Sequence, residues 1–229
     1  MSAGKSEVVI VDYGAGNLRS VARAVAHAGI DALVTAEPRQ VEAASALIVP
    51  GVGAAADTMK HLREGGLDGP VKAHIEAGKP FLGVCMGQQA LFDVSEEGGL
   101  HECLGVLPGR IVRFPRGMTV PHMGWNTVEL RVSHPVFEGI PDGSFFYFVH
   151  SYFPRPDVEA HVIGETDYEG VRFASVVGRD NVIATQFHPE KSSTMGLRLY
   201  ANFVRLARER GSIAPDAAPE AASAPLARS

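Results

Sequence analysis

Residues 81–87 read Phe-Leu-Gly-Val-Cys-Met-Gly, an apolar run that leads into a cysteine flanked by glycines two positions away on either side. We expect a strand over Phe81–Val84 and a helix over Met86–Val94. A side chain on a sharp strand-to-helix turn needs neighbours without bulk, and the start of the helix favours a thiolate. The stretch therefore predicts a turn that presents Cys85 as a nucleophile. A buried cysteine at a strand end is the alternative.

Short apolar strands and helices alternate from this stretch back to the N-terminus. Glu7–Asp12 is a β-branched run that ends in a glycine-rich turn, and apolar residues recur at helical spacing from Asn17 to a stop at Gly29. Short connections between such elements predict an α/β fold, with a mostly parallel sheet flanked by helices on both faces. Further strands are expected at Ala32–Thr35 and Ala46–Val49, and two helices between Ala54 and Ala77.

The pattern changes after Gly105, where strand-like pieces and turn signals replace helical periodicity. We expect these pieces to extend the sheet as added antiparallel strands, before an amphipathic helix at Thr194–Arg210. Residues 212–229 are rich in Ala, Pro and Ser and cannot bury enough surface to offset their ordering entropy. We therefore expect one domain over residues 1–211 and a disordered C-terminal tail over residues 212–229. The pieces lie at Arg110–Phe114, Trp125–Leu130, Ser144–Val149, Val171–Val177 and Val182–Thr185.

Composition excludes several classes of protein. The chain has 229 residues and a net charge of −5, which argues against binding to nucleic acid or to anionic membranes. No apolar stretch approaches the ~20 residues of a membrane span, and the N-terminus lacks the apolar run of a signal peptide. Two cysteines, Cys85 and Cys103, are too few for a disulfide framework or a typical metal site, and Cys103 is structural or incidental. We expect a cytoplasmic protein without a metal ion.

A second motif, Gln186-Phe187-His188-Pro189-Glu190, follows an apolar strand and should reach the same edge of the sheet. His188 can deprotonate Cys85 and later protonate a leaving group, while Glu190 orients the imidazole. The chain has nine histidines, so this motif is weak alone. The two motifs together predict a Cys-His-Glu triad.

These residues resemble the class I (triad) glutamine amidotransferases, over about Ser6 to Gly211. Three further runs look like the glutaminase subunits of imidazole glycerol phosphate synthases, which act in histidine biosynthesis. The resemblance implies a three-layer class I glutamine amidotransferase fold, and it places the protein among hydrolases and lyases. The runs are Asp12–Leu18 (DYGAGNL), Pro121–Asn126 (PHMGWN) and Tyr147–Tyr152 (YFVHSY).

The resemblance also implies a mechanism. Cys85 would attack the side-chain amide of glutamine, release ammonia and leave a glutamyl thioester that water hydrolyses to glutamate. Ammonia would pass to a (β/α)₈-barrel cyclase subunit, the partner in a heterodimer, which makes imidazole glycerol phosphate and aminoimidazole carboxamide ribotide. No cofactor is implied. The family usually has Met where this chain has Gln88, a departure that we expect to be tolerated.

Specific residues carry these implied roles. Oxyanion donors would come from Met86 at the helix start and from Val52 and Gly53 in the loop after the third strand. In the family this loop is thought to hold one donor turned away until the cyclase binds its nucleotide, so we expect the isolated chain to have very low glutaminase activity. Gly53, Gln89, Ser151 and Tyr152 would hold the amino-acid end of glutamine.

A further set of residues matches family positions that face the cyclase. Trp and Met near a polar rim are typical of protein interfaces. Core packing is the alternative for Trp125 and Tyr147, a helix cap for Asn17 and a solvated charge for Lys191. The set comprises Asn17, Met123, Trp125, Tyr147 and Lys191.

Other functions remain as competitors. The glutaminases of anthranilate synthase and of pyridoxal phosphate synthase would lack the Tyr-Gly-x-Gly-Asn start. A cysteine peptidase or a γ-glutamyl hydrolase would use a similar triad, but in an extended open cleft. A catalytically dead scaffold need not keep all three triad groups. A dinucleotide-binding site at Gly14–Gly16 lacks the third glycine of that fingerprint.

Overall fold

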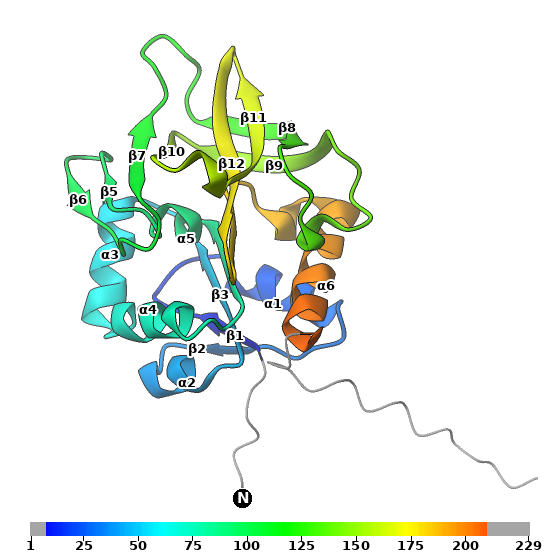
Figure 1. Ribbon diagram of the computed structural model, residues 1–229. Helices are drawn as coiled ribbons and strands as arrows, with labels where there is room; N and C mark the ends of the chain where they lie inside the picture. The colour runs from blue at the N-terminus through cyan, green and yellow to red at the C-terminus, as the bar shows by residue number, and fades with distance from the viewer. Residues whose placement is uncertain (1–7, 210–229) are drawn as a thin grey trace, which may run out of the picture.

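The computed structural model describes residues 8–209, so the tail predicted at 212–229 and the domain limit at residue 211 lie outside the described residues. The described chain forms a nine-stranded sheet with helices on both faces and a smaller four-stranded sheet beside it (Figure 1). The predicted α/β fold with a mixed sheet is confirmed.

Five parallel strands form one half of the main sheet. Helices cover both of its faces, so β1, β3, β4 and β13 are buried along their whole length. β13 lies beside β4 with Thr185 opposite Val84, so the chain leaves both strands at the same edge. The order is β2 (Leu33–Thr35), β1 (Val8–Val11), β3 (Ala46–Gly51), β4 (Phe81–Cys85) and β13 (Val182–Thr185).

Two layers of helices enclose this parallel half (Figure 1). Successive strand residues point to opposite faces. Val8 and Ile10 accordingly pack in the core beneath α1 and α6, whereas Val9 and Val11 pack in the core beneath the other helices. The protein thus has three layers. One contains α1 (Leu18–Ala26) and α6 (Ser193–Glu209), and the other contains α2 (Pro38–Ala43), α3 (Ala55–Glu64) and α4 (Asp68–Glu76).

Four antiparallel strands extend the main sheet beyond β13, and an antiparallel extension of the sheet was predicted. β8 and β9 form its far end, and β9 is the last strand. These strands are β12 (Val171–Arg179), β11 (Val162–Tyr168), β8 (His122–Leu130) and β9 (Ser144–His150). The piece at Val182–Thr185, expected among the added antiparallel strands, is instead β13, which runs parallel to β4, and β11 was not predicted.

The smaller sheet was not predicted. The piece predicted at Arg110–Phe114 is a strand, but its expected place in the main sheet is wrong. It pairs along its whole length with Tyr152–Pro156 instead, because that segment turns back immediately after β9. The order is β10 (Tyr152–Pro156), β7 (Gly109–Arg113), β5 (Val94–Ser95) and β6 (His101–Glu102).

The helix predicted over Met86–Val94 is wrong in its length, because α5 (Met86–Gln89) ends at Gln89. The carbonyls of Ala90 and Leu91 accept from the backbone N–H groups of Leu104 and Val106 rather than from residues one helical turn later. Long-range pairing therefore replaces the second half of the helix. The short elements α2, η1 (Pro135–Phe137), η2 (Glu159–His161) and η3 (Pro189–Lys191) were also not predicted.

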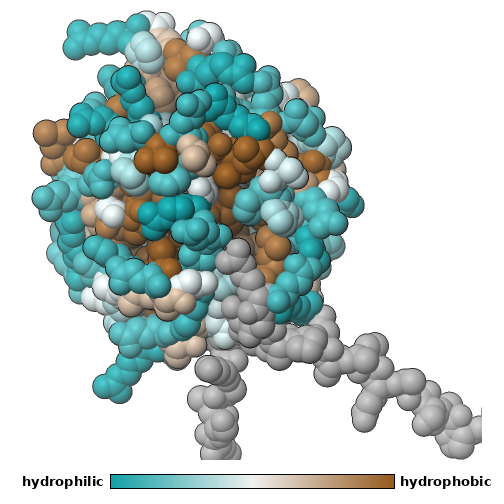
Figure 2. Space-filling view, in the orientation of Figure 1, coloured by the Kyte–Doolittle hydropathy of each residue, from teal (hydrophilic) through white to brown (hydrophobic). Residues whose placement is uncertain are grey.

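The face in Figure 2 is mostly hydrophilic, with hydrophobic residues in separate patches over the middle of the molecule. Among residues 8–209, no helix is both long and apolar enough to cross a membrane.

Candidate active site

Cys85 occupies the turn between β4 and α5 (Met86–Gln89). Its φ of 53° and ψ of −105° are unusual for a residue with a side chain, and such a conformation costs about 1–3 kcal/mol. The flanking glycines make the turn possible. A Cβ at Gly87 would overlap the Val49 carbonyl oxygen, and one at Gly83 would lie 2.7 Å from the Gly87 carbonyl oxygen. The predicted elbow is therefore present, and its steric reason is visible.

The His188–Glu190 pair follows β13, the strand next to β4. His188 Nδ1 lies 2.9 Å from Glu190 Oε1, and the two side chains are only 2% and 1% exposed. His188 Nε2, the other ring nitrogen, is buried and has no hydrogen-bond partner in the described part of the chain. The ring is thus held from one side and free to exchange a proton on the other.

The electrostatic setting favours a charged imidazole. Burial alone would lower the pKa of His188, but nearby Cys85 and the Glu190 carboxylate outweigh that effect and raise it above its ordinary value. A protonated His188 stabilises a thiolate at Cys85, which is the nucleophilic form of cysteine.

Glu190 has two further partners, which sequence reasoning missed. Asn17 Nδ2 donates to Glu190 Oε1 at 2.6 Å, and the Tyr200 hydroxyl donates to Glu190 Oε2 at 3.4 Å. Burial, followed by the neighbouring Glu190, raises the pKa of Tyr200, so this hydroxyl keeps its proton. Asn17 stands at the N-cap position of α1 with a φ of 70°, but its side chain caps nothing, so the helix-cap alternative is wrong.

A cavity of about 150 Å³ opens beside Cys85 and His188. Every residue predicted to bind glutamine or to serve the oxyanion lines it: Val52, Gly53, Met86, Gln89, Ser151 and Tyr152. Glu97, Val149 and His150 also line it and were not predicted. Glu97 Oε2 accepts from the backbone N–H of Ala55, so its carboxylate is held beside the start of α3.

The loop after β3 lies directly against the elbow. Gly51 is opposite Cys85 in the register of β3 and β4, and a Cβ at Gly51 would overlap the Tyr13 hydroxyl and lie 2.6 Å from Met86 Cβ. Val52 and Gly53 are exposed. The two segments expected to supply oxyanion donors are therefore neighbours, one rigidly packed and the other open to solvent.

Two glutamine side chains connect the cavity wall to the thiol. Gln89 Nε2 donates to the Tyr152 carbonyl at 3.0 Å and to Gln186 Oε1 at 2.9 Å, and Gln186 Nε2 lies 3.6 Å from Cys85 Sγ. Gln89 Oε1 is buried and has no partner among the described residues. Gln186 was missed as a site residue although it opens the quoted motif.

Gln88 points away from this cavity network. Its Nε2 lies 3.2 Å from the Ala184 carbonyl and 3.5 Å from the Ser175 carbonyl, and its Oε1 is buried without a partner in residues 8–209. It belongs to the packing between α5 and the sheet.

Met123, Trp125 and Tyr147 share the outer face of the β8–β9 ribbon, where Trp125 stands opposite Tyr147. Met123 is 62% exposed and Trp125 53% exposed, so core packing is wrong for Trp125, whereas Tyr147 is half-buried. The Lys191 ammonium lies 5.7 Å from the centre of the Tyr147 ring. Phe145, which was not predicted, adds a 59% exposed ring to this outer face.

Cys103 lies apart from the cavity. Burial raises the pKa of its thiol to about 11, which makes it a poor nucleophile. Within the described residues, no group of three or more His, Cys, Asp or Glu side chains could hold a metal ion.

Comparison with known proteins identifies the family. The sequence model of class-I glutamine amidotransferases (GATase) matches residues 9–206. The chain is 51% identical to an imidazole glycerol phosphate synthase subunit HisH from Dehalococcoides mccartyi, over 87% of this chain and 97% of that protein. It is 49% identical to the HisH subunit of Herpetosiphon aurantiacus, over 90% and 97% of the two chains.

A solved structure described as a glutamine amidotransferase superposes with a TM-score of 0.69 at 26% identity, covering 87% of this chain and 98% of that one. The glutaminase domain of Trypanosoma brucei CTPS, with a TM-score of 0.64 at 17% identity over 89% and 94% of the chains, shares the fold. The chain belongs to the class-I glutamine amidotransferases and, within them, to the family of imidazole glycerol phosphate synthase HisH subunits.

Proposed function

We propose that this chain is the glutaminase subunit of an imidazole glycerol phosphate synthase, which hydrolyses glutamine and passes the ammonia to a cyclase subunit in histidine biosynthesis. The observation that carries the proposal is that a strained Cys85 and His188, which is paired with the buried Glu190 carboxylate, line the same small cavity. The chain is 51% and 49% identical to two HisH subunits over 97% of the length of each, and this similarity supports a role in histidine biosynthesis.

The chemistry follows from the triad. The Cys85 thiolate attacks the side-chain amide carbon of glutamine, and the imidazolium of His188 gives its proton to the departing nitrogen, which leaves as ammonia. His188 then takes a proton from water, which attacks the thioester and releases glutamate and the Cys85 thiolate. Glu190 holds the ring in its working orientation throughout.

The cavity supplies groups that suit an amino acid. The Glu97 carboxylate suits the α-ammonium group, and the unpartnered Gln89 Oε1 offers an acceptor for another N–H donor. Ser151, Tyr152 and Gly53 line the remaining wall. A volume of about 150 Å³ suits a single small molecule.

The negative charge that develops on the amide oxygen of glutamine during the attack needs hydrogen-bond donors. The Met86 N–H stands at the start of α5, where a helix leaves its amides unpaired, and the Val52–Gly53 segment is close enough to complete the pair. Because Val52 and Gly53 are exposed, contact with a second protein can control their orientation.

The outer face of the β8–β9 ribbon is the proposed docking surface for a (β/α)₈-barrel cyclase in a heterodimer. Met123, Trp125 and Tyr147 form its apolar part. Lys191 follows Glu190 in η3 and lies against the Tyr147 ring, and Asn17 is hydrogen-bonded to Glu190. The ring-closing lyase step would belong to the cyclase, and this chain would need no cofactor. We propose the cytoplasm as the place of this biosynthetic reaction.

The test mixes the chain with its cyclase and compares glutamine with ammonium as nitrogen donor. Cys85→Ala should lose glutamine-dependent synthesis and keep ammonium-dependent synthesis. Loss of neither activity would overturn the assignment of the nucleophile, and high glutaminase activity of the isolated chain would overturn its dependence on the partner.

A further inference from the structure

Two buried histidines outside the triad stand side by side on the inner face of the β8–β9 ribbon, and one of them, His150, lines the cavity. His122 in β8 and His150 in β9 stand opposite each other in the strand register and are 3% and 6% exposed. His122 Nδ1 lies 3.0 Å from His150 Nε2, so the two rings share a hydrogen bond. The proposed mechanism gives neither ring a task.

The direction of that hydrogen bond is fixed from one end. His150 Nδ1 lies 2.8 Å from the Tyr152 carbonyl oxygen, and since a carbonyl can only accept, Nδ1 carries the hydrogen. In a neutral ring Nε2 is then an acceptor, so the hydrogen between the two rings belongs to His122 Nδ1. His122 Nε2 is left as an acceptor.

The contacts of His122 Nε2 are consistent with this hydrogen-bond direction. Asn126 Nδ2 lies 3.3 Å from His122 Nε2 and donates to the Asp167 carbonyl at 2.8 Å. Asn126 Oδ1 accepts from the backbone N–H of Thr127, which fixes the orientation of the amide. Hydrogen bonds therefore run in one direction, from Asn126 through His122 and His150 to the Tyr152 carbonyl.

Both rings must be neutral for this arrangement, and their surroundings keep them so. Burial lowers the pKa of His122 to about 4, against the opposing charge of Glu169. Burial also lowers the pKa of His150 to about 3, opposed by its bond to Tyr152 and assisted by the charges of His122 and His188. Aromatic rings from several elements pack around the pair, namely Phe114, Phe148, Tyr168 and Phe173.

This series of hydrogen bonds ends at the Tyr152 carbonyl, in the wall of the proposed glutamine cavity. The Tyr152 carbonyl accepts a second hydrogen bond from Gln89 Nε2, and Gln89 continues through Gln186 to Cys85 Sγ. His150 and Tyr152 themselves line the cavity. The position of one carbonyl group is thus set jointly by the histidine pair and by a proposed glutamine-binding side chain.

We propose that His122 and His150 are positioning residues, a neutral pair of fixed hydrogen-bond direction that holds the Tyr152 carbonyl and so shapes the glutamine cavity. This inference rests on the proposed glutaminase function for its substrate, but the hydrogen-bond direction can be tested without turnover.

Nitrogen-15 NMR of the full chain with labelled histidine tests the direction. Both rings should carry hydrogen on Nδ1 and remain neutral from pH 8 down to pH 5.5. An Nε2–H tautomer at His150, or titration of either ring near pH 6.5, would overturn the proposal whether or not glutamine is hydrolysed.

Kinetics of the complex with saturating cyclase test the consequence. His150→Leu removes both ring contacts and should raise KM for glutamine about tenfold, with a smaller loss of kcat and unchanged ammonium-dependent synthesis. His150→Asn can still donate to the Tyr152 carbonyl and should recover most of that loss.

His74 provides the matched control, because it is equally buried and its Nε2 lies 3.0 Å from the Pro80 carbonyl, away from the cavity. His74→Leu should leave KM for glutamine unchanged. An equal KM for His150→Leu and His74→Leu would reduce His150 to a packing role, whereas absence of turnover in the unmodified complex would overturn the proposed function instead.

Discussion

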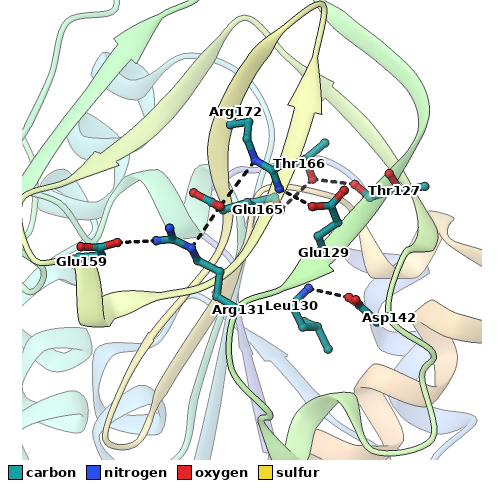
Figure 3. A network of polar contacts seen from close by, with 10 residues as sticks. Thr127, Glu129, Leu130, Arg131, Asp142, Glu159, Glu165, Thr166 and Arg172 are labelled. Atoms are coloured by element: carbon teal, nitrogen blue, oxygen red, sulfur yellow. Dashed lines mark hydrogen bonds and ion pairs between the residues drawn. The ribbon is translucent and has the colours of Figure 1, made fainter.

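Two polar networks in this protein use similar groups in opposite surroundings. The surface network joins Glu159, Arg131, Glu165, Arg172 and Glu129 across β8, β11 and β12 (Figure 3). The triad network joins His188, Glu190, Asn17 and Tyr200. Arg131 Nε lies 3.2 Å from Glu165 Oε2, and this distance is similar to the 2.9 Å between His188 Nδ1 and Glu190 Oε1.

Exposure separates the two networks. In the surface network only Glu165 is largely covered, at 19% exposed, and Glu159 is 83% exposed, so water can replace any lost partner. In the triad network the His188 and Glu190 side chains are only 2% and 1% exposed, so a lost partner leaves a buried group unsatisfied. The distance between two groups therefore does not by itself measure the strength of their interaction, because the cost of breaking it depends on whether water can replace the lost partner.

The largest expected effect follows removal of the central group of the triad network. Glu190→Ala leaves His188 without its orienting partner, so glutamine-dependent kcat should fall at least about 100-fold. Ammonium-dependent synthesis should persist, which assays of both nitrogen donors on one preparation will check. Retention of full glutaminase activity would show that the buried Glu190 carboxylate is dispensable for catalysis.

A smaller effect is expected at the periphery of the same network. Asn17→Ala removes a 2.6 Å hydrogen bond to Glu190, of a kind worth about 1.5–3 kcal/mol, and should lower glutamine-dependent kcat about tenfold at saturating cyclase. The pH–rate profile should shift as well, because the titration of His188 depends on Glu190.

Asn202→Ala is the control for Asn17→Ala, since Asn202 Nδ2 also donates hydrogen bonds, but to the backbone carbonyls of Val136 and Glu138 rather than to Glu190. It should leave kcat unchanged. If the two substitutions lower kcat equally, Asn17 acts only through general stability.

The free energy of unfolding should depend on pH through the buried His150. His150 has a pKa of about 3 when folded and an ordinary value near 6.5 when unfolded, so its contribution to stability is complete above pH 6.5. As the pH falls below 6.5 the unfolded chain takes up the proton first, and this contribution declines by about 1.4 kcal/mol per pH unit. Urea unfolding at several pH values should show a steeper acid dependence for the wild type than for His150→Asn.

The smallest effect is expected in the surface network. Glu165→Gln disrupts contacts to both Arg131 and Arg172, yet the free energy of unfolding should change by less than about 1 kcal/mol. Chemical denaturation at low and high salt will measure it, and the difference should shrink further as salt screens the charges. A loss of several kcal/mol would show that the surface network is as costly to break as the triad network.

Local patterns predicted the parts of the fold that depend on near neighbours. The strands at residues 81–84 and 46–49 and the helix from Asn17 were confirmed because apolar periodicity and glycine stops are local signals. The helix over Met86–Val94 was cut short by backbone bonds to Leu104 and Val106, which no local pattern contains. β10 was missed because its two prolines argue against a strand, although it pairs fully with β7.

The candidate site divides in the same manner. Cys85, His188 and Glu190 stand in short motifs, so their residue types and spacing were enough to propose a triad. Glu97 reaches the cavity and Asn17 reaches Glu190 only through contacts between segments far apart in the sequence, which no local motif contains. His150 and Gln186 stood inside quoted runs, but only the folded chain brings His150 to the cavity wall and Gln186 Nε2 to 3.6 Å from Cys85 Sγ.

The backbone contacts of Tyr147 have a consequence for self-association. β9 is the last strand of the main sheet, and such an edge can add a strand from another molecule and start aggregation. Here the Tyr147 carbonyl accepts from the His188 N–H at 2.9 Å, and the Tyr147 N–H donates to Ser192 Oγ at 3.0 Å. The loop that carries His188 and Glu190 therefore also blocks part of the open edge, so damage to this loop would threaten the solubility of the chain together with its chemistry.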